Sequence, residues 1–95
     1  MHIVVYPAKL LKDEGTIIVS FPDLDGCFTD GSTYAEATRN AQEALELYLA
    51  ALCDDKIEIP EASEPNSISS STDECVALIS TDVDKYRKQK SVKKH

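Results

Sequence analysis

The sequence predicts a two-layer α+β domain in which one long helix lies against a small β-sheet. Three observations predict it. Short segments rich in β-branched and aromatic residues are separated by turn residues. One well-capped segment has helical periodicity, and the elements follow in the order strand, strand, strand, helix, strand, short helix. The 95 residues form one small domain with a thin margin of stability, so self-association would stabilise it.

The first three strands are predicted at residues 2–8, 16–21 and 27–30. Pro7 cannot donate a hydrogen bond to a strand ladder, so we expect it at a strand end or on an edge strand. The polar residues 12–15 predict the turn of a hairpin that joins the first two strands. We expect a hairpin loop of roughly four to seven residues.

The helix is predicted to begin at Thr33 and to end near Cys53. Thr33 and Glu36 have the spacing of a capping box, in which each side chain accepts a hydrogen bond from a free backbone N–H. The apolar positions recur every three or four residues and therefore line one face. These positions are Tyr34, Ala37, Ala41, Ala44, Leu45, Tyr48 and Leu52. The alanines predict a close approach of the early helical turns to the sheet.

The remainder of the chain predicts one more strand and a second helix. Residues 56–60 predict a short extended segment, and the serine-rich residues 61–74 predict a crossing loop. A last strand is predicted at residues 75–80, where four consecutive apolar residues indicate burial on both faces. We therefore expect this strand to be central in the sheet. A short helix is predicted at residues 83–89.

The net charge of −7 is unevenly distributed along the chain. Residues 1–84 hold all 17 acidic residues and four cations, which leaves −13, whereas residues 85–95 hold six cations and no acid. We therefore expect a binding domain at 1–84 and a basic tail or linker at 85–95. A body this acidic repels nucleic acid and attracts basic proteins, although such a charge also serves solubility.

The composition also bears on location and on cofactors. No apolar run approaches the ~18 residues of a membrane span, and no signal peptide precedes the first strand, so we expect a soluble cytoplasmic protein without membrane contact. The three cysteines, Cys27, Cys53 and Cys75, form neither a disulfide framework nor a C-x-x-C motif. Because the only histidines stand near the chain ends, we expect no metal site and no cofactor.

Three aspartates form the one cluster that bears on catalysis. Asp23, Asp25 and Asp30 carry the oxygen ligands that a divalent cation prefers, so a metal-dependent nuclease is one alternative. The simpler interpretation is that they stabilise turns, because two of them follow Pro22 in a loop. The sequence has no glycine-rich phosphate loop and no histidine beside a nucleophile. We therefore expect a binding protein without catalytic residues.

Several motifs of the sequence are similar to those of one known family. Residues 21–33, which read F-P-D-L-D-G-C-F-T-D-G-S-T, closely resemble the F-P-D-L-P-G-C-x-T-x-G-x-T segment of HicB-type antitoxins, and the helix continues the match at residues 36–45. Residues 6–8 are similar to its Y-P-A start, residues 59–63 to its I-P-x-P-S segment, and residues 76–86 to its V-x-V-D-x-x-x-Y close. The resemblance covers nearly residues 3–86. Asp25 departs from it, because the family usually has proline there.

The resemblance implies a fold and a function. It implies a partially degraded ribonuclease-H-like fold, with a double-stranded-RNA-binding-like architecture, that lacks the nuclease's catalytic acids. It also implies an antitoxin of a type II pair that binds and masks a small basic toxin of the HicA type, which cleaves mRNA. Charge and expected exposure, and not the resemblance, select the residues expected to contact this toxin, which are Tyr6, Asp23, Asp25, Phe28 and Asp30. Tyr6 and Phe28 are chosen because an aromatic side chain on an exposed strand can anchor a partner.

The resemblance also bears on assembly and on DNA. Short strands with a free edge often pair, so we expect a homodimer or a higher homo-oligomer. Members of the family usually carry a DNA-binding module after the final tyrosine region, which is where the present sequence ends. We therefore expect binding to operator DNA only if such a module is present. A stand-alone transcriptional regulator that acts through residues 85–95 is the remaining alternative.

Overall fold

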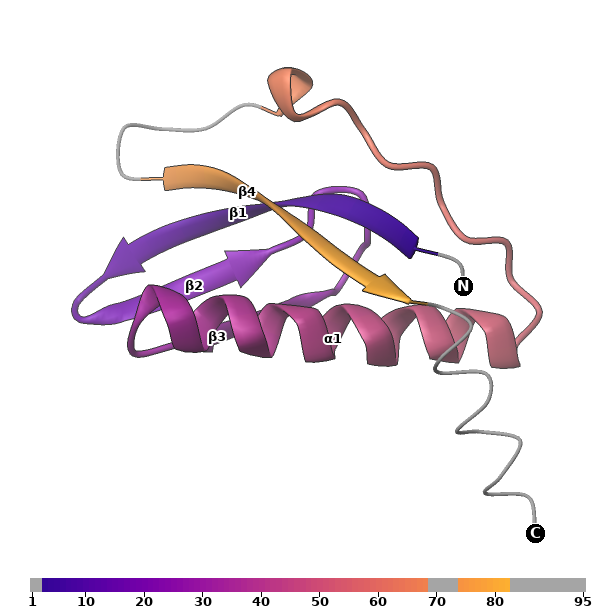
Figure 1. The fold of residues 1–95 in the computed structure, drawn as a ribbon, viewed down its shortest axis with the longest axis horizontal. Helices are drawn as coiled ribbons and strands as arrows, with labels where there is room; N and C mark the ends of the chain where they lie inside the picture. Colours follow the sequence, from indigo (N-terminus) through magenta and orange to yellow (C-terminus); the bar gives the residue numbers. More distant parts are fainter. Residues whose placement is uncertain (1–2, 69–73, 83–95) are drawn as a thin grey trace, which may run out of the picture.

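The computed structural model describes residues 3–68 and 74–82, which form a four-stranded antiparallel sheet and a long helix (Figure 1). The elements are β1 (Ile3–Asp13), β2 (Thr16–Ser20), β3 (Phe28–Gly31), α1 (Tyr34–Asp54), the 3-10 helix η1 (Pro65–Ser67) and β4 (Glu74–Asp82). The strand order in the sheet is β3-β2-β1-β4. The predicted α+β architecture is confirmed. The helix predicted at residues 83–89 lies outside the described residues.

β1 and β2 form a hairpin with a tighter turn than the sequence analysis predicted. Glu14 and Gly15 alone connect the strands, because Asp13 still pairs with Thr16. Both connecting residues have positive φ, at 49° and 81°. This is the conformation of a type I′ turn, which matches the twist of the two strands. The predicted loop of four to seven residues is therefore wrong.

Pro7 lies within β1, an inner strand, so its predicted place at a strand end or edge is also wrong. β2 pairs with β1 only from Lys9 onward. On the other side Pro7 pairs with Leu78 of β4. The Gln42 side chain donates to the carbonyl oxygen of Ser80 at 3.0 Å, which indicates that Ser80 and, by alternation, Leu78 turn their backbone groups away from β1. The β1–β4 ladder therefore loses no hydrogen bond although Pro7 has no N–H.

Among the described residues β4 is an edge strand, which contradicts its predicted central place. Its side chains alternate between the two faces of the sheet. Ile79 and Thr81 face α1 and are buried, whereas Leu78 faces the opposite side and is 59% exposed. The consecutive apolar residues of β4 therefore serve two surfaces, the core and the open face of the sheet.

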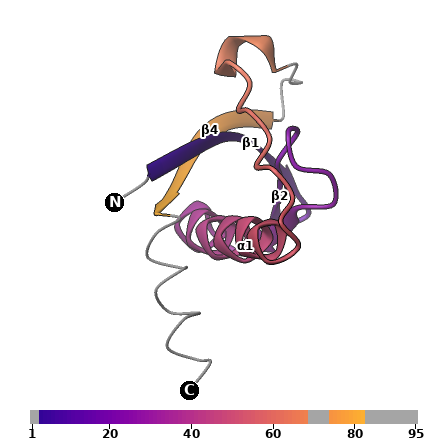
Figure 2. The ribbon, with the colours of Figure 1, turned by 90° about the vertical axis from the view of Figure 1, so that its right-hand side faces the viewer.

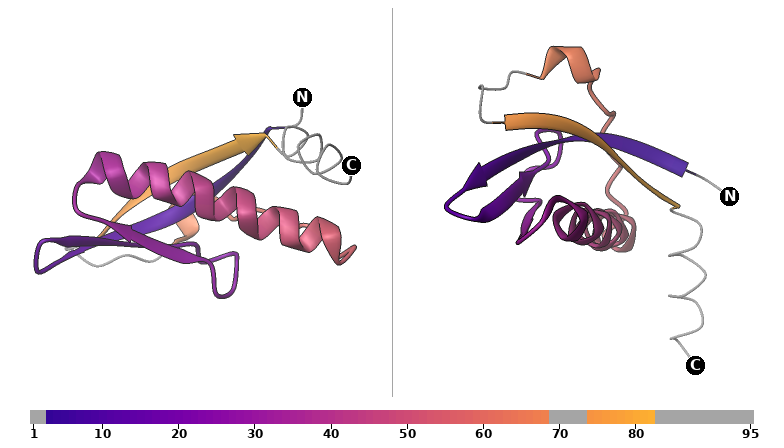
Figure 3. Two further views of the ribbon diagram at one scale, coloured as in Figure 1. Left: turned by 90° about the horizontal axis from the view of Figure 1, so that it is seen from below. Right: turned by 60° about the vertical axis from the view of Figure 1, so that its left-hand side comes forward.

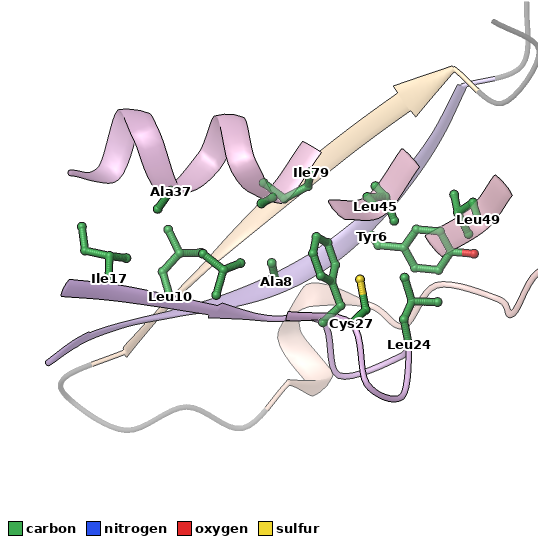
Figure 4. Close-up of a cluster of buried hydrophobic side chains, with 13 residues drawn as sticks. Tyr6, Ala8, Leu10, Ile17, Leu24, Cys27, Ala37, Leu45, Leu49 and Ile79 are labelled. Atoms are coloured by element: carbon green, nitrogen blue, oxygen red, sulfur yellow. The ribbon is translucent and has the colours of Figure 1, made fainter. Parts of the chain in front are cut away.

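Figure 2 shows α1 lying against one face of the sheet, and Figure 4 shows the hydrophobic core between the two layers. Its buried members are Tyr6, Ala8, Leu10, Ile17, Val19, Phe21, Leu24, Cys27, Ala37, Ala41, Leu45, Leu49 and Ile79. Ala37 and Ala41 are fully buried, which confirms the close approach that the alanines predicted. Tyr34 was predicted on this face but is 48% exposed, because it is the first residue of the helix.

The start of α1 is capped almost as predicted. The Thr33 hydroxyl oxygen accepts a hydrogen bond from the Glu36 N–H at 3.1 Å. The Glu36 carboxylate accepts bonds from the N–H and the hydroxyl of Ser32, each at 3.0 Å, instead of from the Thr33 N–H of a standard capping box. The bond from the Ser32 backbone is the main cause that lowers the pKa of the Glu36 carboxyl.

The turn that follows α1 contains a residue in an unfavourable conformation. Lys56 has a φ of 58°, and its N–H donates to the Cys53 carbonyl while the Ile57 N–H donates to the Leu52 carbonyl. These are the bonds of a Schellman motif, which favours glycine at the position of Lys56.

We expect Lys56→Gly to raise the free energy of unfolding by about 1 kcal/mol, because a left-handed conformation costs an L-residue roughly 1–2 kcal/mol. Urea unfolding followed by circular dichroism measures the change. Lys56→Ala is the matched control, because it removes the charge but keeps the Cβ. An equal gain in both variants would contradict the conformational explanation.

Candidate functional site

The sheet face turned away from α1, named the outer face, is the candidate binding surface (Figure 3). Strand alternation and the pairing register place sixteen residues on this face. They are Ile3, Val5, Pro7, Lys9, Leu11 and Asp13 of β1; Thr16, Ile18 and Ser20 of β2; Phe28 and Asp30 of β3; and Glu74, Val76, Leu78, Ser80 and Asp82 of β4.

The outer face exposes an unusual amount of apolar surface. Five of the eight exposed large hydrophobic side chains among the described residues lie on it: Phe28, Leu78, Ile3, Val5 and Ile18, with exposures from 70% down to 38%. The open face of an antiparallel sheet normally carries polar side chains. An apolar surface of this kind is typical of a site that binds another macromolecule.

Phe28 is positioned by the compact loop of residues 21–27. The loop folds back through two turns: the Leu24 N–H donates to the Phe21 carbonyl at 3.0 Å, and the Cys27 N–H donates to the Leu24 carbonyl at 3.1 Å. Gly26 occupies the third position of the second turn with a φ of 79°, which L-residues avoid. Because the Leu24 side chain is buried in the core, the loop is anchored and starts β3 with Phe28 on the outer face.

Residues 57–68, the crossing segment, run from the end of α1 past the sheet to its outer side, as Figures 1 and 2 show, and Ile59 packs against the core on the way. The Asp23 carboxylate holds this segment, because it accepts hydrogen bonds from the Ser63 N–H, at 2.8 Å, and from the Ser63 hydroxyl. The Tyr6 hydroxyl donates a hydrogen bond to the Pro60 carbonyl oxygen. Pro7 is fully buried although it lies on the outer face. The Phe28 end of the face stays exposed.

The five predicted contact residues differ in their exposure and contacts in the structure. Phe28 and Asp30 lie on the outer face and are exposed, as expected. Asp25 is exposed in the preceding loop, where its carbonyl oxygen accepts a bond from the Tyr48 hydroxyl at 2.9 Å. Tyr6 is only 2% exposed, so the expectation that it lies on an exposed sheet face is wrong. Asp23 is half-buried, and Ser63 occupies both of its carboxylate oxygens.

Sequence reasoning missed the four other exposed apolar residues of the outer face. Ile3, Val5 and Ile18 alternate with buried residues along β1 and β2, which is the signal that could have found them. Leu78 sits within a continuous apolar run, where no alternation is visible.

The charges of the outer face are predominantly acidic. Asp13 and Asp30 lie at the end nearest the hairpin turn, and Glu74 and Asp82 lie at the ends of β4. Lys9 is the one cation on this face within the described strands. The apolar surface is therefore bordered by negative charge, which complements a basic protein.

The three aspartates of the nuclease alternative do not form one cluster. Asp23 binds Ser63, Asp25 lies in the loop, and Asp30 lies on β3. Residues 3–68 and 74–82 contain no group of three or more His, Cys, Asp or Glu side chains arranged to hold a metal ion. Within the same residues, no helix is long and apolar enough to cross a membrane.

The pKa of the Tyr6 hydroxyl, which binds Pro60 of the crossing segment, is shifted from its usual value. Burial, and secondly the negative charge of Asp23, raise the pKa of the Tyr6 hydroxyl above its usual value of 10.0. Because the folded state keeps the Tyr6 proton more tightly than the unfolded state, the contribution of Tyr6 to the free energy of unfolding is fully present below pH 10. This contribution is lost as pH rises through the folded-state pKa.

We expect Tyr6→Phe to lower the free energy of unfolding by about 1 kcal/mol at pH 7, because the bond to Pro60 is lost. The difference in the free energy of unfolding between Tyr6→Phe and the wild type should become smaller above pH 10, because only the wild type loses the contribution of the Tyr6 hydroxyl. Urea unfolding at several pH values measures both effects. Tyr34→Phe, at an exposed tyrosine, is the control, and a difference that is constant with pH would refute the assignment.

Comparison with known proteins identifies the family. Residues 6–94 match the HicB-like antitoxins of bacterial toxin-antitoxin systems. The chain belongs to the HicB-like antitoxin family. This confirms the family that the motifs of residues 21–33 predicted.

Relatives of known structure have the same fold. The chain is similar to a chain of a toxin-antitoxin complex from Streptococcus pneumoniae, with a TM-score of 0.80, 28% identity, and coverage of 90% of this chain and 73% of that chain. It is also similar to a chain of a HicA3 and HicB3 toxin-antitoxin complex, with a TM-score of 0.67, 26% identity, and coverage of 80% and 95%.

A curated relative comes from a phage. A 14.9 kDa protein of Haemophilus phage HP1 is 36% identical to this HicB-like chain over 59 residues, which are 62% of this chain. The match spans 44% of the phage protein, less than half of its length.

Proposed function

We propose that this HicB-like chain is the non-catalytic antitoxin of a type II pair and that it binds and masks a basic HicA-type toxin that cleaves mRNA. The apolar outer face, led by Phe28 at 70% exposure within an acidic border, carries this proposal. An exposed aromatic side chain supplies a desolvated anchor, and the surrounding carboxylates attract a basic partner. The similar chains in solved toxin-antitoxin complexes support the same role.

Masking requires that the antitoxin compete with the RNA substrate of the toxin. RNA presents a line of negative phosphates, and residues 1–84 of this chain carry four cations against 17 acids. The same positive surface of a ribonuclease therefore attracts both ligands. We propose residues 1–84 as the toxin-binding unit and the cytoplasm as the place of action. The tail at 85–95, the homo-oligomer and operator binding stay predictions.

The test is co-expression with the protein encoded by the neighbouring reading frame, which is the candidate toxin. The chain should restore growth of cells that express the toxin, and the purified pair should form a complex that weakens as salt rises from 0.05 to 0.5 M, values on the order of those that screen exposed charges. A toxin that stays active and unbound at low salt would remove the main support for the proposal. RNA cleavage by the chain alone, dependent on Mg²⁺ or Mn²⁺, would favour the nuclease alternative.

A further inference from the structure

The backbone of β4 has one side without a neighbouring strand among the described residues. Val76, Leu78 and Ser80 occupy the alternate positions whose N–H and C=O groups point away from β1. The Gln42 side chain binds the carbonyl oxygen of Ser80. An uncovered strand edge of this kind is a template for one more strand.

β4 lacks the features that normally prevent the addition of a strand. The residues between Glu74 and Asp82 are C-V-A-L-I-S-T, with neither a charge nor a proline. The pairing with β1 runs without a bulge from Glu74 to Asp82. Proteins usually protect a long edge strand with lysine, proline or a bulge. The edge of β4 is therefore suited to a partner.

A groove lies beside this edge, between β4 and the first half of α1, with a volume of about 290 Å³. It is lined by Ala35, Thr38, Arg39, Gln42, Leu78, Ile79 and Ser80. Ala35 and Thr38 are small and lie one helical turn apart. The inward side chains of an added strand would therefore have room against α1.

The charges near the groove indicate which strand fits. Glu74 and Asp82 stand at the two ends of β4, and the Glu46 carboxylate of α1 accepts a hydrogen bond from the Thr81 hydroxyl at 3.0 Å. Arg39 is the one cation among the lining residues, and Glu36 lies three residues before it on the same side of the helix.

A second copy of this chain fits the edge poorly. If two copies of β4 paired antiparallel about Leu78, the Glu74 of each copy would stand opposite the Asp82 of the other. Like charges that stand directly opposite each other destabilise a strand pair. A strand with Lys or Arg near both ends would be attracted instead.

We propose that the free edge of β4 and the adjoining groove take up an extended, basic segment of the toxin as a fifth strand of the sheet. The identity of the partner rests on the proposed function. The outward N–H and C=O groups of Val76 and Leu78 form the new ladder, and cations of the added segment lie near Glu74 and Asp82. Leu78 belongs to both surfaces, so the edge is continuous with the outer face.

Amide hydrogen exchange tests the fifth strand directly. The full chain is measured by NMR alone and with a catalytically inactive variant of the toxin from the neighbouring reading frame. The N–H groups of Val76 and Leu78 should exchange at least about tenfold more slowly in the complex, because they gain hydrogen bonds. The N–H of Ile79 is the internal control, because it already faces β1 and should change little.

A variant pair supplies a second test. Val76→Pro removes one outward N–H without removing a bond to β1, whereas Val76→Thr keeps it. Toxin binding should weaken at least about tenfold in Val76→Pro only, with the fold of each variant checked by circular dichroism.

The outcomes separate the two proposals. Binding with unchanged exchange at Val76 and Leu78 overturns the fifth strand and leaves the proposed function intact. Absence of binding at low salt overturns both. Protection that appears with rising concentration of this chain alone assigns the edge to a second copy and also overturns the fifth strand. If Val76→Pro does not fold, the exchange measurement on the wild-type chain still decides.

Discussion

The Gly31→Ala variant should lose about 3 kcal/mol or more of the free energy of unfolding, which lowers the melting temperature by about 15 °C in a domain of this size. A Cβ at residue 31 would lie 2.5 Å from the N atom and 2.7 Å from the Cα atom of Ala37. Both contacts are to backbone, so no side chain can rotate away. The first turn of α1 would have to move off β3, which also exposes the core beside Ala37.

Gly15→Ala is the matched control for this prediction. Gly15 has a φ of 81°, and nothing lies within 4 Å of an added Cβ. Its substitution therefore costs only the conformational penalty of about 1 kcal/mol. Thermal and urea unfolding of both variants measure the difference. If Gly31→Ala is as stable as Gly15→Ala, the close approach of α1 to β3 is not essential to the fold.

The helix was predictable because its determinants are local. The apolar spacing and the cap at Thr33 lie within one segment, and the structure begins α1 one residue later. The hairpin turn is local as well, but residues 12 and 13 are polar and therefore fit a turn as well as a strand end. In the structure these residues lie at the exposed end of β1, where polar side chains are accommodated.

The place of β4 depends on contacts that no local pattern contains. A strand buried on both faces and an edge strand with two apolar faces have the same sequence pattern. The difference lies in whether another strand lies beside it, and within residues 3–68 and 74–82 the order β3-β2-β1-β4 ends at β4. Leu78 is therefore exposed although its sequence neighbours resemble those of a central strand.

The candidate site also depends on contacts that no local sequence pattern contains. Phe28 was predictable as an exposed aromatic, because it directly follows a loop. Tyr6 and Asp23 had similar local signals, but their partners Pro60 and Ser63 are 54 and 40 residues away in the sequence. Through these distant contacts, both residues hold the crossing segment in place. A long-range hydrogen bond thus decides between a surface role and a structural role.

We expect Phe28→Asp to weaken binding of the toxin at least about 100-fold, which corresponds to roughly 3 kcal/mol. The Phe28 side chain is 70% exposed in the isolated chain, so an interface that covers it gains most of the transfer free energy of a phenylalanine, about 2–3 kcal/mol. The substitution removes this gain and also forces a charge into the covered surface, which costs more. Stability should change little, because Phe28 is outside the core.

Leu47→Asp is the control that distinguishes a specific binding site from non-specific hydrophobic association. Leu47 is 63% exposed and lies on α1, the layer opposite the outer face. The two substitutions change hydrophobicity and charge in the same way, at different surfaces. Isothermal titration calorimetry with an inactive toxin variant, together with growth rescue, should show a loss for Phe28→Asp and near wild-type behaviour for Leu47→Asp. If Leu47→Asp gives the larger loss, the toxin binds the helical layer and the outer face is not the binding surface.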